Sequence, residues 1–271
     1  MRLRLATWNI NSVRLRIELV ARFLKDEAPD VLCLQETKCR DGEFPFVPFH
    51  KLGYSHVAIS GQKGYHGVAV ASKLPLAQIS QRFFCGNGDA RHICVILAPG
   101  GTQSPPITLH NFYVPAGGDE PDPGINPKFA HKLAFLEEMA EWIRLGGIAQ
   151  SPAILAGDLN IAPLETDVWN HKALLSVVSH TPIEVEKFWA VHAAGPWVDA
   201  LRHFIPPEER LYTWWSYRAR DWRKSDRGRR LDHIWVSESL KPHLDAARVL
   251  PDSRGWEKPS DHVPVIAELQ F

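Results

Sequence analysis

The chain has 271 residues, of which 45% are hydrophobic and 23% charged, and its 31 Lys and Arg residues equal its 31 Asp and Glu residues in number. This composition is ordinary for a globular protein, and it excludes a scaffold that depends on disulfides or structural metal for a core. The zero net charge gives no support to nucleic-acid binding, so any such interaction must depend on local charge.

Short apolar segments bounded by Gly, Pro, Asn or Asp recur along the chain, as is typical of β-strands. These predicted strands are residues 3–8, 31–35, 56–59, 68–72, 92–97, 107–112, 153–156, 230–236 and 263–269. Apolar residues at helical spacing predict helices over residues 15–26 and 127–145, the second ending at Gly146. Residues 114–124 are rich in Pro and Gly and predict a loop. No long linker interrupts the pattern, which favours a single domain over residues 1–271 with two packed sheets and helices on their outer faces.

The cysteines and the N-terminal segment indicate the compartment. Cys33 and Cys94 lie inside apolar runs and no Cys-x-x-Cys pair occurs, so buried free thiols are expected. The N-terminal segment resembles a strand and not a signal peptide, and no apolar run has the length needed to span a bilayer. We therefore expect a cytoplasmic protein with no membrane partner.

Polar residues stand at the ends of these predicted strands. The segments are Trp8-Asn9-Ile10-Asn11, Gln35-Glu36-Thr37-Lys38, Asn111-Phe112-Tyr113, Gly157-Asp158-Leu159-Asn160, Arg230-Leu231-Asp232 and Ser260-Asp261-His262. They supply carboxylates, amide groups and one imidazole, a set that suits Mg²⁺ or Mn²⁺ better than a thiolate-binding metal. Each segment alone is more often a turn, a cap or a solvated loop. Their joint occurrence at strand ends, where sites form, predicts a single active site.

The same segments resemble the exonuclease III family of apurinic/apyrimidinic (AP) endonucleases, within the endonuclease–exonuclease–phosphatase superfamily. Two further matching segments are Gly64-Tyr65-His66-Gly67-Val68-Ala69 and Tyr212-Thr213-Trp214-Trp215-Ser216-Tyr217-Arg218. The resemblance runs from residue 8 to residue 265. It implies an α/β fold, a four-layer α/β sandwich of two mixed β-sheets flanked by helices, similar to deoxyribonuclease I.

The resemblance also implies a reaction and roles for the residues. The reaction is magnesium-dependent cleavage of duplex DNA at abasic sites or 3′ ends by a monomer, leaving a 3′-hydroxyl and a 5′-phosphate. The ion is expected at Glu36 with help from Asn9 and Asp261, and Asp158 and Asn160 add oxygens. Asp158 is expected to activate water and His262 to contact the phosphate, although the residues alone leave open which of the two is the base. Asn160 is expected to hold the water, Asp232 to orient the imidazole, and Tyr113 to contact the phosphate or the leaving oxygen.

A basic and aromatic stretch predicts where DNA binds. Residues 210–230 hold eight arginine or lysine residues against Asp221 and Asp226, interleaved with five aromatic residues. Such a mixture suits a phosphate backbone with an exposed base or sugar, although the alternative of core tryptophans and solvated arginines remains open. The resemblance implies DNA contacts by Tyr65, Trp214, Arg218, Arg229 and Leu231, with Trp214 and Leu231 as walls of a pocket for the base-less sugar.

Two positions depart from the family pattern. Arg229 stands where relatives commonly carry a pocket Trp, and Ala116 stands where they often carry Asn or Gln. These changes predict weaker selection of an internal abasic sugar and a preference for trimming 3′ ends. Two alternatives use the same pattern: a phosphatase acting on inositol phosphates or sphingomyelin, or a DNA-binding module without catalysis. The basic aromatic stretch argues against the first alternative, and the intact set of polar residues argues against the second.

Overall fold

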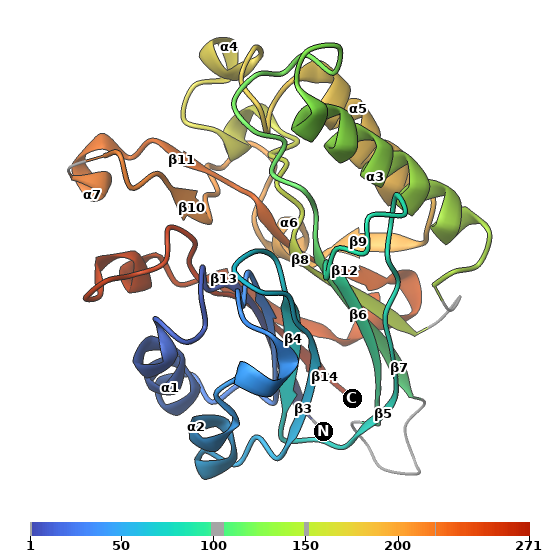
Figure 1. The fold of residues 1–271 in the computed structure, drawn as a ribbon, viewed down its shortest axis with the longest axis vertical. Helices are drawn as coiled ribbons and strands as arrows, with labels where there is room; N and C mark the ends of the chain where they lie inside the picture. Colours follow the sequence, from blue (N-terminus) through green and yellow to red (C-terminus); the bar gives the residue numbers. More distant parts are fainter. Residues whose placement is uncertain (1, 99–105, 149–151, 220) are drawn as a thin grey trace.

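Two six-stranded sheets pack face to face in a computed structural model, which describes residues 2–98, 106–148, 152–219 and 221–271 (Figure 1). The first sheet has the order β13 (Leu244–Val249), β14 (Val265–Gln270), β1 (Arg2–Asn9), β2 (Val31–Gln35), β4 (Val68–Ser72) and β3 (His56–Ser60). The second has the order β5 (Leu76–Ser80), β6 (His92–Leu97), β7 (Ile107–Tyr113), β8 (Ala153–Asp158), β12 (Asp232–Ser237) and β9 (Trp197–Asp199). Each sheet is mixed, because β1 and β2 are parallel, β7 and β8 are parallel, and the other pairs are antiparallel.

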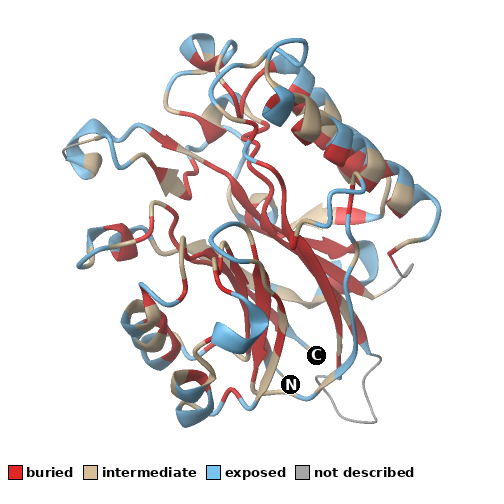
Figure 2. Cartoon of the chain, viewed as in Figure 1, coloured by how far each residue is buried: buried red, intermediate tan, exposed pale blue. Residues whose placement is uncertain are grey.

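Alternation along the strands places apolar side chains on both faces of each sheet. In β1, Leu3 and Leu5 join the core between the two sheets, whereas Ala6 and Trp8 join a cluster on the outer face. Successive side chains of a strand point to opposite faces, so a strand buried on both faces reads as a continuous apolar run. Figure 2 shows the result, with the strands of both sheets mostly buried.

Helices close the two outer faces. On the first sheet lie α1 (Ile17–Asp26) and α2 (Phe46–Lys51), which contribute Phe23 and Phe49 to the outer cluster. On the second sheet lie α3 (Pro127–Arg144) and α5 (Pro182–Ala193), which contribute Met139 and Phe188 (Figure 1). The order helix, sheet, sheet, helix confirms the predicted four-layer α/β sandwich.

Shorter elements cover the end of the sandwich where the strands carry their polar residues. They are the ribbon β10 (Trp214–Trp215) and β11 (Gly228–Arg229), the helices α4 (His171–Leu174) and α7 (Trp222–Ser225), and the 3₁₀ turns η1 (Asp41–Glu43), η3 (Glu165–Asp167) and η5 (Pro251–Gly255). Helix α6 (Ala200–Phe204) packs against β12 and β13, and the 3₁₀ turn η4 (Glu238–His243) follows β12 at the opposite end of the sandwich.

Several predicted boundaries shift in the structure. The strand predicted from Arg230 begins at Asp232, because the Arg230 amide donates outside the sheet, to the carbonyl of Asp167. The last strand begins at Val265 and not at residue 263. Helix α1 begins two residues later than predicted and leaves Leu15 exposed. The predicted buried free thiols are confirmed for Cys33 and Cys94.

Candidate active site

The alternation that builds the inner core also directs the polar strand ends into the space between the sheets. In β8, Ile154 and Ala156 belong to the inner core, and Asp158 follows two residues later on the same face. In β12, Asp232 stands two residues before Ile234, which is also in the inner core. The core pattern therefore places both carboxylates at one end of the sandwich.

Strand pairing brings these ends into adjacent positions. Asp158 is the Cα partner of Tyr113 in β7 and of Asp232 in β12. Asn9 ends β1 of the opposite sheet, and its amide nitrogen donates across the gap to Asp158 Oδ2 at 2.8 Å. The two sheets thus meet at hydrogen-bonded polar side chains.

A buried polar layer lies near this meeting point. Gln35 Nε2 donates to Thr7 Oγ1 at 2.8 Å and to Asn111 Oδ1 at 2.7 Å, which joins one sheet to the other. Asn111 Nδ2 donates to the carbonyl oxygens of Leu34 and Ala69 at 3.0 and 2.9 Å. Losing any of these hydrogen bonds would leave a buried polar group unpaired, which is costly. The network therefore fixes the relative position of the sheets next to the site.

Asp158 is completely buried and accepts several hydrogen bonds. Asn160 donates to it from its backbone at 2.9 Å and from its side chain at 3.1 Å, in addition to the Asn9 bond. Burial raises the pKa of Asp158 to about 7, although the charge of His262 opposes that rise. A carboxylate with a pKa near neutrality suits proton transfer.

His262 lies between two carboxylates. Its Nδ1 atom is 2.9 Å from Asp232 Oδ2, and its Nε2 atom is 3.7 Å from Asp158 Oδ2. Although burial opposes the charged ring, Asp232 and Asp158 raise the pKa of His262 to about 10. Thr213 Oγ1 donates to the same Asp232 oxygen at 2.6 Å. The predicted bond from Asp232 to the imidazole is present, and it leaves His262 as a cation near neutral pH.

Glu36 forms a second acidic centre beside the first. Its Oε1 atom accepts from Asn9 Nδ2 at 2.9 Å and from the Tyr113 hydroxyl at 2.8 Å, and its Oε2 atom contacts Lys38 Nζ at 2.8 Å. Although burial opposes ionisation, Lys38 and the hydrogen bond from Asn9 lower the pKa of Glu36. Burial and Glu36 together raise the pKa of Tyr113, so this hydroxyl stays protonated.

Backbone conformation contributes to the placement of these groups. Glu36 and Asn160 have φ values of +51° and +54°, in the left-handed region that non-glycine residues seldom occupy. Gly157 precedes Asp158 with φ +143°, and a Cβ atom there would lie 1.9 Å from the carbonyl oxygen of Phe112. Close approach of β7 and β8 at this point therefore requires glycine.

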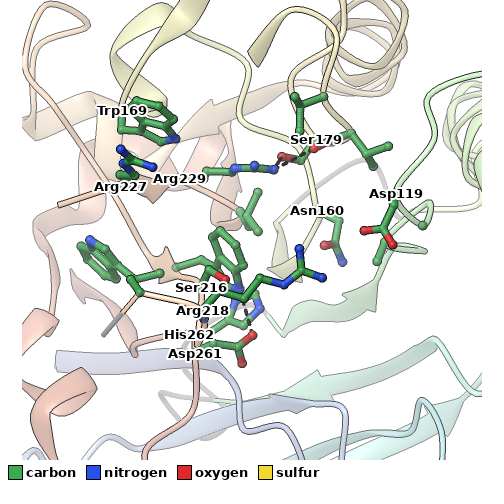
Figure 3. Close-up of a pocket in the computed structure, with 18 of the residues that line it drawn as sticks. Asp119, Asn160, Trp169, Ser179, Ser216, Arg218, Arg227, Arg229, Asp261 and His262 are labelled. Carbon is green, nitrogen blue, oxygen red and sulfur yellow. Dashed lines mark hydrogen bonds between the residues drawn. The ribbon is translucent and has the colours of Figure 1, made fainter. Parts of the chain in front are cut away.

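A cavity of about 810 Å³ opens over these residues (Figure 3). Of the residues singled out in the sequence, those that line it are Glu36, Ala116, Asn160, Trp214, Arg218, Arg229, Leu231, Asp261 and His262. Asn9, Tyr113, Asp158 and Asp232 are buried. Tyr65 is 71% exposed, next to His66, whose ring lies 6.1 Å from that of Tyr113. Tyr65 therefore stands at the periphery of the site and does not line the cavity.

The basic aromatic stretch divides into core and cavity residues. Tyr212 and Trp215 are buried in a small cluster with Val263, and Trp215 also borders the cavity. Trp214 is half-buried in the cavity lining and donates from Nε1 to Asp261 at 2.9 Å. Arg230 is fully buried and pairs with Asp167 and Asp199, so it stabilises the fold and cannot contact DNA. Arg220 lies outside the described residues. The core alternative is therefore correct for Trp215 and Arg230, and DNA contact by Trp214, Arg218 and Arg229 stays a prediction.

Sequence patterns missed three supporting residues. Thr213 holds Asp232, and Lys132 on α3 donates to the carbonyl oxygen of Asn160 at 2.7 Å. Ser179 lies in the cavity wall and bonds Arg229. Of the three, only Lys132 left a signal in the sequence. It stands on the apolar face of a predicted helix, and a charged residue in such a position is buried. Asp158, Asp232 and His262 each offer a possible ligand atom within 4.8 Å of the others, so the site contains an acidic cluster able to hold a metal ion.

Comparison with known proteins agrees with this geometry. Residues 6–262 match the family described as Endonuclease/Exonuclease/phosphatase family. The chain belongs to this family. It is 31% identical to the exodeoxyribonuclease III of Haemophilus influenzae and 33% identical to an exodeoxyribonuclease of Bacillus subtilis, in each case over 97% of this chain and 98% of the relative. These two relatives place it in the exonuclease III branch of the endonuclease/exonuclease/phosphatase family.

Solved structures of the family share the fold. An AP endonuclease from Archaeoglobus fulgidus superposes with a TM-score of 0.89 at 33% identity, covering 99% of this chain and 100% of the relative. The 3′ phosphatase NExo from Neisseria, bound to a product DNA hairpin, gives 0.89 at 29% identity with the same coverage. Within the described part of this chain, no helix is both long and apolar enough to cross a membrane.

Proposed function

We propose that this chain is a magnesium-dependent DNA-repair nuclease that hydrolyses phosphodiester bonds in duplex DNA. It incises 5′ to abasic sites and removes 3′ nucleotides and 3′ blocking groups, leaving a 3′-hydroxyl. The relatives named exodeoxyribonuclease and AP endonuclease support this activity, as does the relative bound to a DNA hairpin. The observation that carries the proposal is the line from Asp232 through His262 to Asp158, in which His262 lines the cavity.

The oxygens around Glu36 fit a hard divalent cation. Its Oε2 atom already accepts the ammonium group of Lys38, so this position stabilises positive charge. Glu36 would hold Mg²⁺ or Mn²⁺, with Asn9 and Asp261 nearby, and Asp158 with Asn160 would supply further oxygens. When bound, the ion supplies positive charge to the phosphate oxygens and to the leaving oxygen. Asn9 now donates from its amide nitrogen to Glu36 and Asp158, so a role as oxygen ligand requires its amide to turn.

Asp158 acts as the base in this proposal and His262 as the cation. A histidine with a pKa of about 10 carries its proton at neutral pH and cannot accept another, whereas the raised pKa of Asp158 suits it to take a proton from water. Asn160 holds the water and the Asp158 carboxylate. His262 donates to a non-bridging phosphate oxygen, and Tyr113 donates to the phosphate or the leaving oxygen.

The balance between substrates depends on Arg229. Its Nη1 atom donates to the Val178 carbonyl and to Ser179 Oγ, both at 2.8 Å, which fixes the guanidinium in the cavity wall. A charged group in place of a flat apolar wall favours 3′ ends over an internal base-less sugar. Ala116, also in the lining, offers no polar side chain to the internal site.

The test is cleavage of two matched duplexes, one with an internal abasic site and one with a blocked 3′ end. We expect chelation to abolish cleavage and Mg²⁺ to restore it. Asp158→Asn, Glu36→Gln and His262→Gln should each lower kcat by a factor of about 10² to 10⁴. Glu141→Gln, which removes an exposed carboxylate of α3, is the control and should cut normally. Natural rates in Asp158→Asn would refute the proposed base, and cleavage that resists chelation would refute the metal.

A further inference from the structure

Three guanidinium groups line the cavity without a carboxylate partner. Arg218, Arg227 and Arg229 all face it, and among the residues that the structure describes none of the three forms an ion pair (Figure 3). Arginines elsewhere in the chain commonly do, as Arg230 does with Asp199. Unpaired arginines gathered in one cavity are suited to bind an anion, because their N–H groups match carboxylate and phosphate oxygens.

Two of the three are held in place by tryptophan rings. Arg229 lies over Trp214, with 5.3 Å from its Cζ atom to the ring centroid, and Arg227 lies over Trp169 at 4.7 Å. The Trp169 amide donates to the carbonyl of Gly228, which lies between the two arginines in the chain. We call these two pairs the Arg–Trp wall. Stacking of this kind fixes a guanidinium plane. Because Arg229 Nη1 already donates to Val178 and Ser179, its other terminal nitrogen and the guanidinium of Arg227 are left for an anion.

In the part of the chain that the structure describes, the guanidinium groups of the Arg–Trp wall form no ion pair with the acidic residues of the cavity. Glu36 and Asp261 lie at the catalytic end and are already bonded, Glu36 to Lys38 and Asp261 to Trp214 Nε1. Asp119 lies across the cavity, near Asn160 (Figure 3). The two guanidinium groups therefore present positive charge beside the place proposed for the scissile phosphate, and the one carboxylate that contacts the wall, Asp261, bonds Trp214 and neither arginine.

We propose that the Arg–Trp wall binds a second anion, located on the 3′ side of the scissile phosphate, so that the enzyme favours 3′ blocking groups that carry their own negative charge. This inference rests on the proposed nuclease function. A terminal base-less sugar without a 3′-phosphate does not use these charges, whereas a carboxylate or terminal phosphate forms charge-assisted hydrogen bonds with them. Water attacks the phosphorus, the bond to the upstream 3′-oxygen breaks, and that oxygen takes up a proton. The charged fragment departs as a phosphate monoester.

The test compares two pairs of duplexes. Within each pair the DNA up to and including the scissile phosphate is the same, and only the group on its 3′ side differs. The first pair ends in phosphoglycolate or in the neutral analogue 2-hydroxyethyl phosphate. The second pair ends in a tetrahydrofuran abasic residue with or without a 3′-phosphate. We expect the natural protein to show about ten-fold higher kcat/KM on the charged member, which corresponds to about 1.4 kcal/mol. A preference in the first pair identifies a carboxylate as the second anion, and one in the second pair identifies a phosphate.

Arg229→Gln and Arg227→Gln should each lower the rate on the charged member more than on the neutral one and bring the ratio toward one. The matched control is Arg22→Gln, because Arg22 also stacks on a tryptophan, 4.2 Å from the Trp256 ring, but lies on α1 outside the cavity. It should keep the ten-fold ratio. Arg227 is exposed, so its variant serves if Arg229→Gln folds poorly.

Equal rates on both members of both pairs in the natural protein would overturn this proposal and leave the nuclease function intact. Ratios that survive both glutamine substitutions would also overturn it, since the preference would then come from other residues. Failure to cut any of the four ends would instead refute the proposed function.

Discussion

Lys132 Nζ lies 2.5 Å from Glu184 Oε1, and both side chains are completely buried. The pair joins α3 to α5 and continues into the site, because Lys132 also donates to the carbonyl oxygen of Asn160. Glu184 accepts the backbone amide of Ser179 with both oxygens, at 2.9 and 2.8 Å. The Lys132–Glu184 ion pair thus supports two parts of the site. One is the segment that follows the proposed base Asp158, and the other is the cavity wall at Ser179, which holds Arg229.

The first prediction concerns this ion pair. Lys132→Met should lower the free energy of unfolding by about 3–5 kcal/mol, because it leaves the Glu184 carboxylate buried without a counter-charge. The double variant Lys132→Met with Glu184→Gln should recover part of that loss. Denaturant unfolding measures both. A single variant as stable as the natural protein would show that the pair contributes nothing.

The second prediction concerns the orientation of His262. Asp232→Asn should lower kcat by about a hundred-fold and lower the pKa of the His262 ring, because Asp232 is the first of the carboxylates that raise it. Nuclear magnetic resonance of the ring follows its titration directly. Thr213→Val is the comparison variant. It removes the hydroxyl that donates to Asp232 and accepts the backbone amides of Leu231 and Asp232, but it keeps the Asp232 charge, so the pKa of His262 should fall less. An unchanged titration in Asp232→Asn would contradict the assigned pairing.

The third prediction concerns stability at acid pH. Burial lowers the pKa of His110 to about 3 and that of His233 to about 3, and it lowers the pKa of His92 well below its usual value. The unfolded chain binds these protons near pH 6.5, whereas the folded chain does not. The stability that these three histidines contribute as neutral rings is therefore full above pH 6.5 and is lost as the pH drops toward 3, by up to about 1.4 kcal/mol per pH unit for each histidine.

Unfolding measured between pH 8 and pH 4.5 tests this dependence. His110→Gln should reduce its slope. Val95→Ala, in the same sheet and also buried, should lower stability equally at every pH. An unaltered slope in His110→Gln would exclude His110 as a source of the acid sensitivity.

The fourth prediction concerns substrate balance. Arg229→Trp places a flat apolar ring where the guanidinium now bonds Val178 and Ser179. The ratio of internal abasic-site incision to 3′-end removal should rise by about ten-fold, a typical effect of one pocket side chain on selectivity. Parallel assays on the two duplexes give the ratio. The same ratio in both proteins would rule out Arg229 as the determinant.

The sequence alone was sufficient to predict most of the strands whose apolar residues form the inner core and the outer clusters. Their apolar runs are short and bounded by turn residues, so the strands from β1 to β8 other than β5 were recognisable. It was not sufficient for β5, whose residues are mostly exposed, or for the three-residue β9, because neither has an apolar pattern. Edge strands owe their structure to pairing with a neighbour, and such pairing leaves no local signal.

For the site, the sequence determined the identity of the polar residues and the strand ends that carry them. Alternation with a period of two then aims Asp158 and Asp232 into the space between the sheets. Only the tertiary structure decided their partners, because the contact between Asn9 and Asp158 spans 149 positions and that between Asp232 and His262 joins separate segments. It also decided that Arg230 is buried in ion pairs while Arg229 lies in the cavity wall, a difference between neighbours in the chain that charge and hydropathy cannot distinguish. The physical reason is that burial and the pKa of a charged group depend on which distant groups surround it, and folding alone brings those groups together.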